Sequence, residues 1–440
     1  MGRVEGSILL TENPCGMEPH KENAMSRNPT RSKFSSLQQV IEWIPPYLVA
    51  KLARKHGVDS RARGFSPWSH VVALLYAQLV HAISLNDVCD GLRLHAPKLW
   101  RLREATPPSR NGFSHANKVR PAAMAEELFW SVLGHLTTIQ PRFGGRTYGG
   151  MPRRFKRLVH AVDATTIQLV ANCIDWARHR RKKAAAKMHL RLNLGSFLPA
   201  FAIVDTAKLT DARAAWAVCA GIGRGEIVVF DKAYVDFAHL FELTGRGVFW
   251  VTRAKNNMNA RCIKRRLRRP AGNIVRDDLV MLNVASSREA YPEPLRRIVA
   301  KVEIDGEMVE MTFITNNMQW AASSIAELYK CRWGIEVFFK QIKQTLQLCS
   351  FLGHSRNAIQ WQVWMALLLY VLLRFQGFVC DWPHSFTRLF CLVRALVWDS
   401  LALGPLLRSY GTARGSFRML VVPHQGYFPG FEAYFAPGGG

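Results

Sequence analysis

Three carboxylates in this sequence could meet and bind metal ions. Asp163 follows the apolar segment LVHAV and Asp231 follows EIVVF, and each segment has the length and composition of a buried strand. Because ligands bind at the carboxyl ends of parallel strands, we expect both aspartates to end their strands and project into one crevice, with Glu336 of a later helix closing over it. Three hard oxygen ligands suit Mg²⁺, and two such ions can support phosphoryl transfer. The alternative for either aspartate alone is a residue that caps the turn after its strand.

Glu336 lies in the segment Ile325–Leu348, whose apolar residues recur at helical spacing, and we predict one continuous helix there. At about 100° per residue, one face of this helix carries a single carboxylate among four donors: Tyr329, Arg332, Glu336, Lys340 and Lys343. Cations beside a metal-binding carboxylate can hold a polyanion without competing for the metal. From this helix alone, the alternative is a solvated ladder of salt bridges.

The charge balance indicates a polyanionic partner. The 440 residues include 59 Lys and Arg against 32 Asp and Glu, a formal net charge of +27. A field of that sign favours nucleic acid or an anionic membrane surface. Three basic runs contribute to it, at 152–157, 178–183 and 261–269. Arg253 and Lys255, at the end of a predicted strand near the crevice, are the scattered cations expected to touch DNA.

Membrane and secreted classes of protein fit the sequence poorly. The longest apolar run, Met365–Leu373, is far shorter than the ~20 residues of a spanning helix. The first residues lack the pattern of a signal peptide. Nine cysteines without a C-x2-C pair fit reduced thiols in a cytoplasmic protein, without a zinc finger or a disulfide framework.

The first third of the chain has a helical pattern. Residues 1–33 show no periodicity and are expected to form a flexible tail. Over 34–140 we predict an all-helical domain of short helices, which Ser36 or a residue just before it, Ser66 and Ser84 could cap. Basic residues between the helices suggest a DNA-binding domain of the helix-turn-helix kind, and a plain packing domain is the alternative.

The rest of the chain has an α/β pattern. Strands alternate with helices over 150–255 and 309–380, which indicates an α/β core with a mostly parallel sheet. Between these parts, 256–308 is predicted to be a β-rich insertion. The apolar segment 358–375 is predicted to be a core helix under the sheet, and 381–440 one more helix followed by a loose tail.

A resemblance joins these patterns. The spacing Tyr329-x2-Arg332-x3-Glu336-x6-Lys343 matches the Y-R-E-K signature of the DDE transposases in the bacterial insertion-sequence family four. Three other segments support the resemblance in the same order along the chain: 163–167 (DATTI), 231–237 (DKAYVDF) and 249–255 (FWVTRAK). The chain resembles this family from about Phe34 to Leu406. The resemblance implies a ribonuclease-H-like catalytic core with a β-rich insertion between the second Asp and the Glu.

The resemblance also implies a reaction. Asp163, Asp231 and Glu336 would be the catalytic triad and hold two Mg²⁺ ions, which Mn²⁺ could replace. The residues expected to contact phosphates at the transposon end are Tyr329, Arg332 and Lys343. Family members cleave DNA at inverted-repeat ends and join the freed 3′-OH to target DNA. The implied partners are double-stranded DNA and a second copy of the chain in a synaptic complex, at the bacterial nucleoid.

Two departures leave the hairpin step of some relatives open. Lys232-Ala233-Tyr234 stands where the family usually has Arg-Gly-Tyr, and 311–313 lacks the Trp onto which some relatives flip a base. Trp250, Tyr291 and Trp320 are nearby candidates for that role, and each is also expected as a packing residue.

Two rival classes remain beside the transposase. One is a sequence-specific DNA-binding protein of the same ancestry, catalytically inactive or domesticated, and the other is a metal-dependent nuclease without strand transfer. The three intact carboxylates argue against the first, and a target-joined product would exclude the second.

Overall fold

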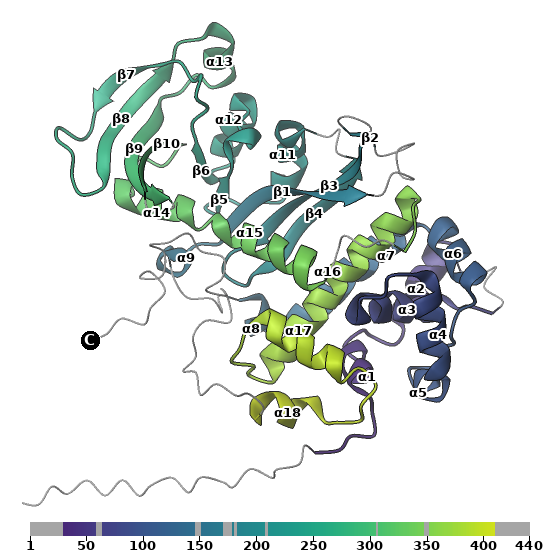
Figure 1. Cartoon of the computed structure of the whole chain (residues 1–440). Helices are drawn as coiled ribbons and strands as arrows, with labels where there is room; N and C mark the ends of the chain where they lie inside the picture. The colour runs from purple at the N-terminus through teal and green to yellow at the C-terminus, as the bar shows by residue number, and fades with distance from the viewer. Residues whose placement is uncertain are drawn as a thin grey trace, which may run out of the picture.

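The computed structural model describes eight stretches of the chain: residues 30–58, 64–145, 151–169, 178–179, 183–206, 210–304, 307–346 and 352–409. Within them the protein has a mixed α/β architecture, with one large sheet and many helices (Figure 1). The basic run at 178–183 lies largely outside these stretches.

The described strands form one ten-stranded sheet. They are β1 (Val159–Leu169), β2 (Arg178–His179), β3 (Lys183–Asn193), β4 (Leu198–Thr206), β5 (Ile227–Phe230), β6 (Phe249–Arg253), β7 (Ala260–Arg265), β8 (Ile274–Leu282), β9 (Leu295–Ile304) and β10 (Glu307–Thr315). β3 pairs antiparallel with β1, β2 and β4, whereas β5 is parallel to both β1 and β6. The prediction of a mostly parallel sheet is therefore wrong. A turn of only four residues, 194–197, joins β3 to β4, and parallel strands need a longer crossover.

The insertion extends this sheet. Its strand-like segments 278–284 and 296–304 lie in β8 and β9, with the short helix α13 (Ala285–Ala290) between them, and β7 is a further strand that was not predicted. β9 pairs with β10, which in turn pairs with β6, so the insertion continues the ladder of the core strands (Figure 1). It therefore extends the central sheet, where the sequence suggested a subdomain of its own.

Both faces of the sheet are covered, because neighbouring residues of a strand point to opposite sides. On β5, Ile227 and Val229 join one apolar cluster and Val228 and Phe230 join the other. The second cluster also contains residues of α11 (Asp211–Cys219) and α12 (Phe237–Gly245). The first contains residues of α14 (Ala322–Lys330) and α15 (Trp333–Lys340), which cross the sheet in Figure 1.

The helical pattern predicted for 34–140 is confirmed. The helices there are α1 (Ser36–Ile41), α2 (Leu48–Lys55), α3 (Pro67–Val80), α4 (Leu85–Leu94), α5 (Ala96–Trp100), α6 (Arg110–Val119) and α7 (Ala122–Ile139), and the short α8 (Pro141–Gly144) and α9 (Met151–Arg154) follow. Ser35, Ser66 and Ser84 accept backbone N–H groups at the starts of α1, α3 and α4, as serine does at helix N-termini.

Helix α16 (Arg356–Val379) links the helical block to the sheet. It is long and apolar enough to cross a membrane, but 83% of its most apolar window is buried inside the protein, as in a core helix. The Trp361 indole donates to Arg120 O of the helical block at 2.8 Å. On the sheet side, the Tyr370 hydroxyl donates to Phe197 O at 3.1 Å and the Gln360 amide to Val204 O at 3.0 Å. The predicted core helix is thus confirmed, and it packs against both parts.

The two ends of the described chain meet. Ser32 N donates to Ser400 O at 2.9 Å and Ala402 N donates to Thr30 O at 2.8 Å. Residues 30–33, predicted as part of a flexible tail, are therefore paired, and residues 1–29 and 410–440 lie outside the described stretches. The same pairing interrupts the single helix predicted after Pro383, so that α17 (Phe386–Ala395) and α18 (Leu403–Ser409) are separate.

Candidate active site

The sheet register places the two aspartates level with each other. The last parallel pair between β1 and β5 is Val162 with Phe230, so Asp163 and Asp231 are the next residues on the two neighbouring strands. Asp231 follows the end of β5 as predicted. Asp163 does not end its strand, because β1 continues to Leu169 along its antiparallel partner β3. The two aspartates therefore meet where β5 stops and β1 runs on.

Glu336 comes from an interrupted helix. Instead of one helix over Ile325–Leu348, α14 ends at Lys330, α15 begins at Trp333, and a π-helical turn, η5, follows over Gln341–Thr345. Cys331 and Arg332 keep right-handed helical backbone angles, so α14 and α15 lie nearly in line (Figure 1). The prediction of one continuous helix is wrong in detail, but Glu336 still lies over the sheet.

Arg332 joins two of the three carboxylates. Its Nη1 donates to Asp163 Oδ2 and its Nη2 to Glu336 Oε1, each at 2.7 Å. The Arg332 side chain is only 8% exposed. From the sequence we expected Arg332 to face phosphates beside the carboxylates without competing with the metal. In the structure it is their direct counter-ion.

The three carboxyl groups act on one another electrostatically. Burial raises the pKa of Asp163, Arg332 and the Ala164 N–H lower it, and Glu336 and Asp231 raise it, with a net pKa of about 6. The Ala164 N–H donates to Asp163 Oδ1 at 2.7 Å. A buried carboxyl group with two acidic neighbours is typical of a site built for a cation.

The carboxylate oxygens of the candidate site are of the chemical type that binds a divalent metal. Asp231 Oδ1 accepts Ala233 N at 3.1 Å, so Asp231 also caps its turn, as the alternative reading expected. Among the residues that the structure describes, no three His, Cys, Asp or Glu side chains stand close enough to hold a metal ion together. Arg332 lies between Asp163 and Glu336 and neutralises the negative charge that a metal cation would otherwise neutralise. The carboxylate oxygens of Asp163 and Glu336, which share the Arg332 charge, are hard ligands of the kind that Mg²⁺ prefers.

The other predicted cations lie at different depths. Lys340 is exposed, whereas Lys343 in η5 is half-buried, which lowers its pKa. The Lys255 ammonium donates to Val235 O at 2.8 Å, and Arg253, half-buried, ends β6 opposite Phe313. Lys340 is therefore the most accessible of the predicted DNA contacts on the helical segment that carries Glu336.

Each aromatic residue considered near the site has packing contacts with other rings. Tyr329 is buried, with its ring centroid 5.0 Å from that of Phe313. Trp250 and Tyr291 belong to the fully buried core, which confirms their packing role. Trp320 packs in a tilted arrangement against the rings of Phe155 and Phe249, with centroids 4.8 and 5.0 Å away.

One neighbour of the site was missed. His189 of β3, fully buried, lies opposite Ala164, and its Nδ1 is 3.0 Å from the Tyr234 hydroxyl. The Tyr234 hydroxyl thereby joins the motif after Asp231 to β3. A lone histidine within the apolar segment MHLRLNL was the available signal.

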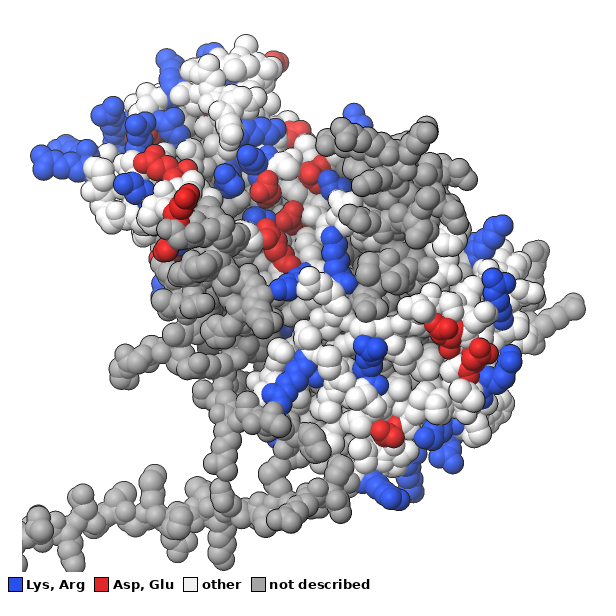
Figure 2. Space-filling model, in the orientation of Figure 1, with Lys and Arg blue, Asp and Glu red and all other residues white. Residues whose placement is uncertain are grey.

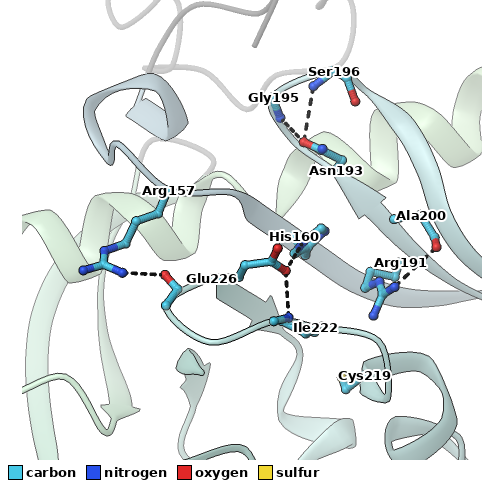
Figure 3. Close-up of polar contacts among 12 residues, drawn as sticks. Arg157, His160, Arg191, Asn193, Gly195, Ser196, Ala200, Cys219, Ile222 and Glu226 are labelled. Atoms are coloured by element: carbon cyan, nitrogen blue, oxygen red, sulfur yellow. Dashed lines mark hydrogen bonds and ion pairs between the residues drawn. The ribbon is translucent and has the colours of Figure 1, made fainter. Parts of the chain in front are cut away.

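The opposite end of the strands is closed by polar contacts. His160 and Glu226 pair at 3.0 Å, and the Glu226 carboxylate also accepts Gly223 N at 3.1 Å (Figure 3). Arg157 donates to Gly225 O at 2.8 Å. Arg157, the last residue of the basic run at 152–157, is therefore part of the fold.

Acidic and basic side chains lie around the candidate site on one face of the molecule. Figure 2 shows acidic side chains gathered over the region where α15 crosses the sheet, with Lys and Arg beside them. A denser group of Lys and Arg lies at the outer end of the insertion, where β7 and the residues after it carry exposed cations of the run at 261–269.

Comparisons with known proteins find transposases. The family described as Transposase DDE domain matches residues 154–372, and a domain of unknown function (DUF4372) matches residues 32–102. A putative transposase of Sinorhizobium fredii, y4zB, is 32% identical over 66% of this chain and 79% of its own length. The probable transposase of insertion sequence element IS5377 from Geobacillus stearothermophilus is 27% identical over 50% of this chain and 57% of its own length.

A third relative is similar over less than half of each chain. Transposase InsG of insertion sequence element IS4 from Escherichia coli is 26% identical over 43% of this chain and 43% of its own length. The DDE domain match spans both aspartates, Arg332 and Glu336. The chain therefore belongs to the DDE transposases, of the type found in insertion sequence IS4.

Proposed function

We propose that Asp163, Asp231 and Glu336 form the metal-binding centre that cleaves DNA at the transposon's inverted-repeat ends and joins them to target DNA. The observation that carries the proposal is the register of β1 and β5, which sets the two aspartates side by side. The contact of Arg332 with both Asp163 and Glu336 adds the third carboxylate to the same crevice.

The strand arrangement supports a ribonuclease-H-like core. The strands run in the order β4-β3-β1-β5-β6, with the first three antiparallel and β5 and β6 parallel to β1. The insertion strands lie between Asp231 and Glu336 in the chain, where the resemblance places them.

The residues that would hold the metal are three carboxylates, and two Mg²⁺ ions would fit the proposed chemistry, with Mn²⁺ as a substitute. When bound, the ions would activate the attacking oxygen and stabilise the leaving one. Asp163 Oδ2 and Glu336 Oε1, which Arg332 now holds, are the natural ligand atoms. Arg332 would then turn its charge toward the adjacent phosphate, as the resemblance implies, together with Tyr329.

We propose double-stranded DNA as the substrate. Lys340 and Lys343 follow Glu336 along the helix, Arg253 ends β6, the strand next to that of Asp231, and Lys255 follows it. The net charge of +27 and the exposed cations of the insertion support a phosphate-tracking surface whose affinity falls with salt. We propose that the helical block over 34–140 contributes DNA contacts and that two copies pair the ends in a synaptic complex at the nucleoid.

The test uses a DNA fragment that spans the gene and its flanks, incubated with protein and Mg²⁺, with 3′-OH ends mapped. Wild type should give discrete ends, and Glu336→Gln should lose them by roughly a hundredfold or more while still binding DNA. Glu327→Gln is the matched control, because Glu327 lies one helix earlier and pairs with Arg154 at 3.7 Å.

Other outcomes separate the rivals. Specific binding of the ends without any wild-type cut would favour a catalytically inactive DNA-binding protein. Scattered Mg²⁺-dependent nicks without target-joined product would favour a nuclease. Cleavage by Glu336→Gln at the wild-type rate would remove Glu336 from the triad.

A further inference from the structure

The last turn of the catalytic helix is capped by the helical block. Helix ends leave carbonyl groups without partners within the helix, and here these are the carbonyls after η5. His81 Nε2 lies 2.9 Å from Thr345 O, and the Gln78 amide donates to Leu346 O. Both side chains come from the end of α3, more than 260 residues earlier in the chain.

The contacts of His81 define its proton. Arg394 Nη1 lies 2.7 Å from His81 Nδ1, and a guanidinium group can only donate. Nδ1 must therefore accept, so the ring proton is on Nε2 and points at Thr345 O. Burial lowers the pKa of His81, the Thr345 contact raises it, and Arg394 lowers it, with a net pKa below the ordinary value, which favours this neutral form.

The surroundings fix the His81 ring in place. The ring stacks on buried Phe390 of α17, with centroids 5.0 Å apart and planes 21° apart. The backbone of His81 is left-handed, at φ 60° and ψ 46°, which is uncommon for a residue other than glycine. The Thr345 hydroxyl meets that of Thr387, also on α17, at 3.0 Å. Residues at the end of α3 and on α17 thus contact the end of η5 from two helices.

The capped turn carries a proposed DNA contact. π-Helical turns are rare and often occur at functional sites, because the extra residue turns the side chains away from their α-helical positions. Lys343 lies inside η5, seven residues after Glu336. We propose that His81 is a positioning residue, whose contact with Thr345 maintains the π-turn and thereby sets the direction of Lys343 toward the DNA beside Glu336.

This inference depends on the proposed role of Lys343, and two variants of His81 test it. His81→Leu removes both polar contacts at similar size, whereas His81→Gln keeps one donor and one acceptor. The control is His95→Leu, because His95 belongs to the same helical block and its ring stacks on Trp398, with centroids 4.6 Å apart. All variants are compared as full-length protein with wild type for melting temperature, DNA affinity and cleavage rate at saturating DNA.

His81→Leu should lower the saturated cleavage rate about tenfold with little change in DNA affinity or melting temperature, and His81→Gln should restore much of it. In a Lys343→Ala background, His81→Leu should lower the cleavage rate little further, because His81 acts through Lys343. Hydrogen exchange should increase at the amides of 341–346 in His81→Leu and stay unchanged in His95→Leu.

The readouts separate this inference from the proposed function. If wild type cleaves and His81→Leu matches it in rate and exchange, the positioning role is wrong and the proposed function stands. Additive losses in the Lys343→Ala background would also overturn it. If wild type does not cleave, the proposed function fails, and unchanged exchange at 341–346 would still refute the capping role.

Discussion

Arg332 gives the site an internal counter-ion. Two neighbouring, partly buried carboxylates would repel each other, and the guanidinium group between Asp163 and Glu336 offsets that repulsion. Five donors in a planar fork suit such a bridge better than an ammonium group. The same contact sets Arg332 in competition with any metal for Asp163 Oδ2 and Glu336 Oε1.

We therefore expect Arg332→Ala to bind Mn²⁺ about tenfold more tightly than wild type, because the competing charge is gone. Titration calorimetry on DNA-free protein would measure this affinity. Cleavage should nevertheless fall, because Arg332 would no longer contact the phosphate at the transposon end.

Arg356→Ala is the matched control for this experiment. Arg356 forms a more exposed ion pair with Asp205 at 2.9 Å, so its removal should leave Mn²⁺ affinity unchanged. An Arg332→Ala protein that binds Mn²⁺ no better than wild type would show that Arg332 supports the metal site rather than competing with it.

The residues of the site could be predicted from sequence, but their contacts could not. The spacing of Arg332 and Glu336, four residues apart on a helix, predicted that they are neighbours. The contact with Asp163 spans 169 positions and depends on how α15 lies over β1. For that reason Arg332 was expected at the DNA surface.

At the scale of the element, helix α15, which carries Glu336, makes its closest approach to the sheet at a glycine. A Cβ atom at Gly334 would lie 2.9 Å from Leu194 Cδ2 and 3.5 Å from Phe197 Cε2. Both residues belong to the turn between β3 and β4. The close approach brings α15 down onto the sheet and sets the height of Glu336 over the aspartates.

Gly334→Ala should therefore push α15 away from the turn and lower the cleavage rate more than it lowers DNA affinity. Leu194→Val, which removes one methylene group at the contact, should recover part of that loss when combined with Gly334→Ala. Cleavage kinetics at saturating DNA would measure both effects.

Gly134→Ala serves as the control, because Gly134 is exposed in α7 and a Cβ there would meet nothing within 4 Å. It should leave cleavage intact and stabilise the helix by about 0.5–1 kcal/mol. Equal cleavage by Gly334→Ala and wild type would show that α15 has room to spare.

Local signals predicted the elements well, whereas tertiary contacts decided their ends. Ser66 and Ser84 cap helices as expected, because a cap acts over three residues. The π-turn after Lys340 was not predictable, because the apolar spacing there fits an α-helix and the capping groups come from α3. β1 was predicted too short for the same reason: its extension depends on β3.

At the scale of the whole molecule, α16 makes the helical block and the sheet one body. Its residues belong to the same apolar cluster as α3, α7 and β1. An apolar helix does not reveal its neighbours in its sequence, so α16 was assigned to the sheet alone. The contact of the two chain ends, residues 30–33 with 400–402, was equally invisible to local patterns.

A buried histidine lies in this body. His70 of α3 is fully buried, with Nε2 2.8 Å from Asn117 Oδ1 and its ring centroid 4.6 Å from that of Trp361 on α16. Burial and then Arg120 lower the pKa of His70 from 6.5 to about 3, against an opposing effect of Asn117. The folded protein thus keeps His70 neutral where the unfolded chain would protonate it.

The stability of the protein should therefore depend on pH through His70. Between pH 6.5 and about 3 the unfolded chain holds one more proton at this residue, so the free energy of unfolding falls as the pH falls. From pH 6.5 to 5 the expected loss is about 2 kcal/mol. Urea unfolding of wild type and His70→Gln at both pH values would measure this loss. The variant should be less stable than wild type at pH 6.5, because packing against Trp361 is lost. On acidification its free energy of unfolding should fall by about 2 kcal/mol less than that of wild type.

His115→Gln, at an exposed histidine of α6, should keep the wild-type loss. If His70→Gln lost as much stability as wild type between the two pH values, protonation elsewhere in the molecule would have to account for the acid sensitivity.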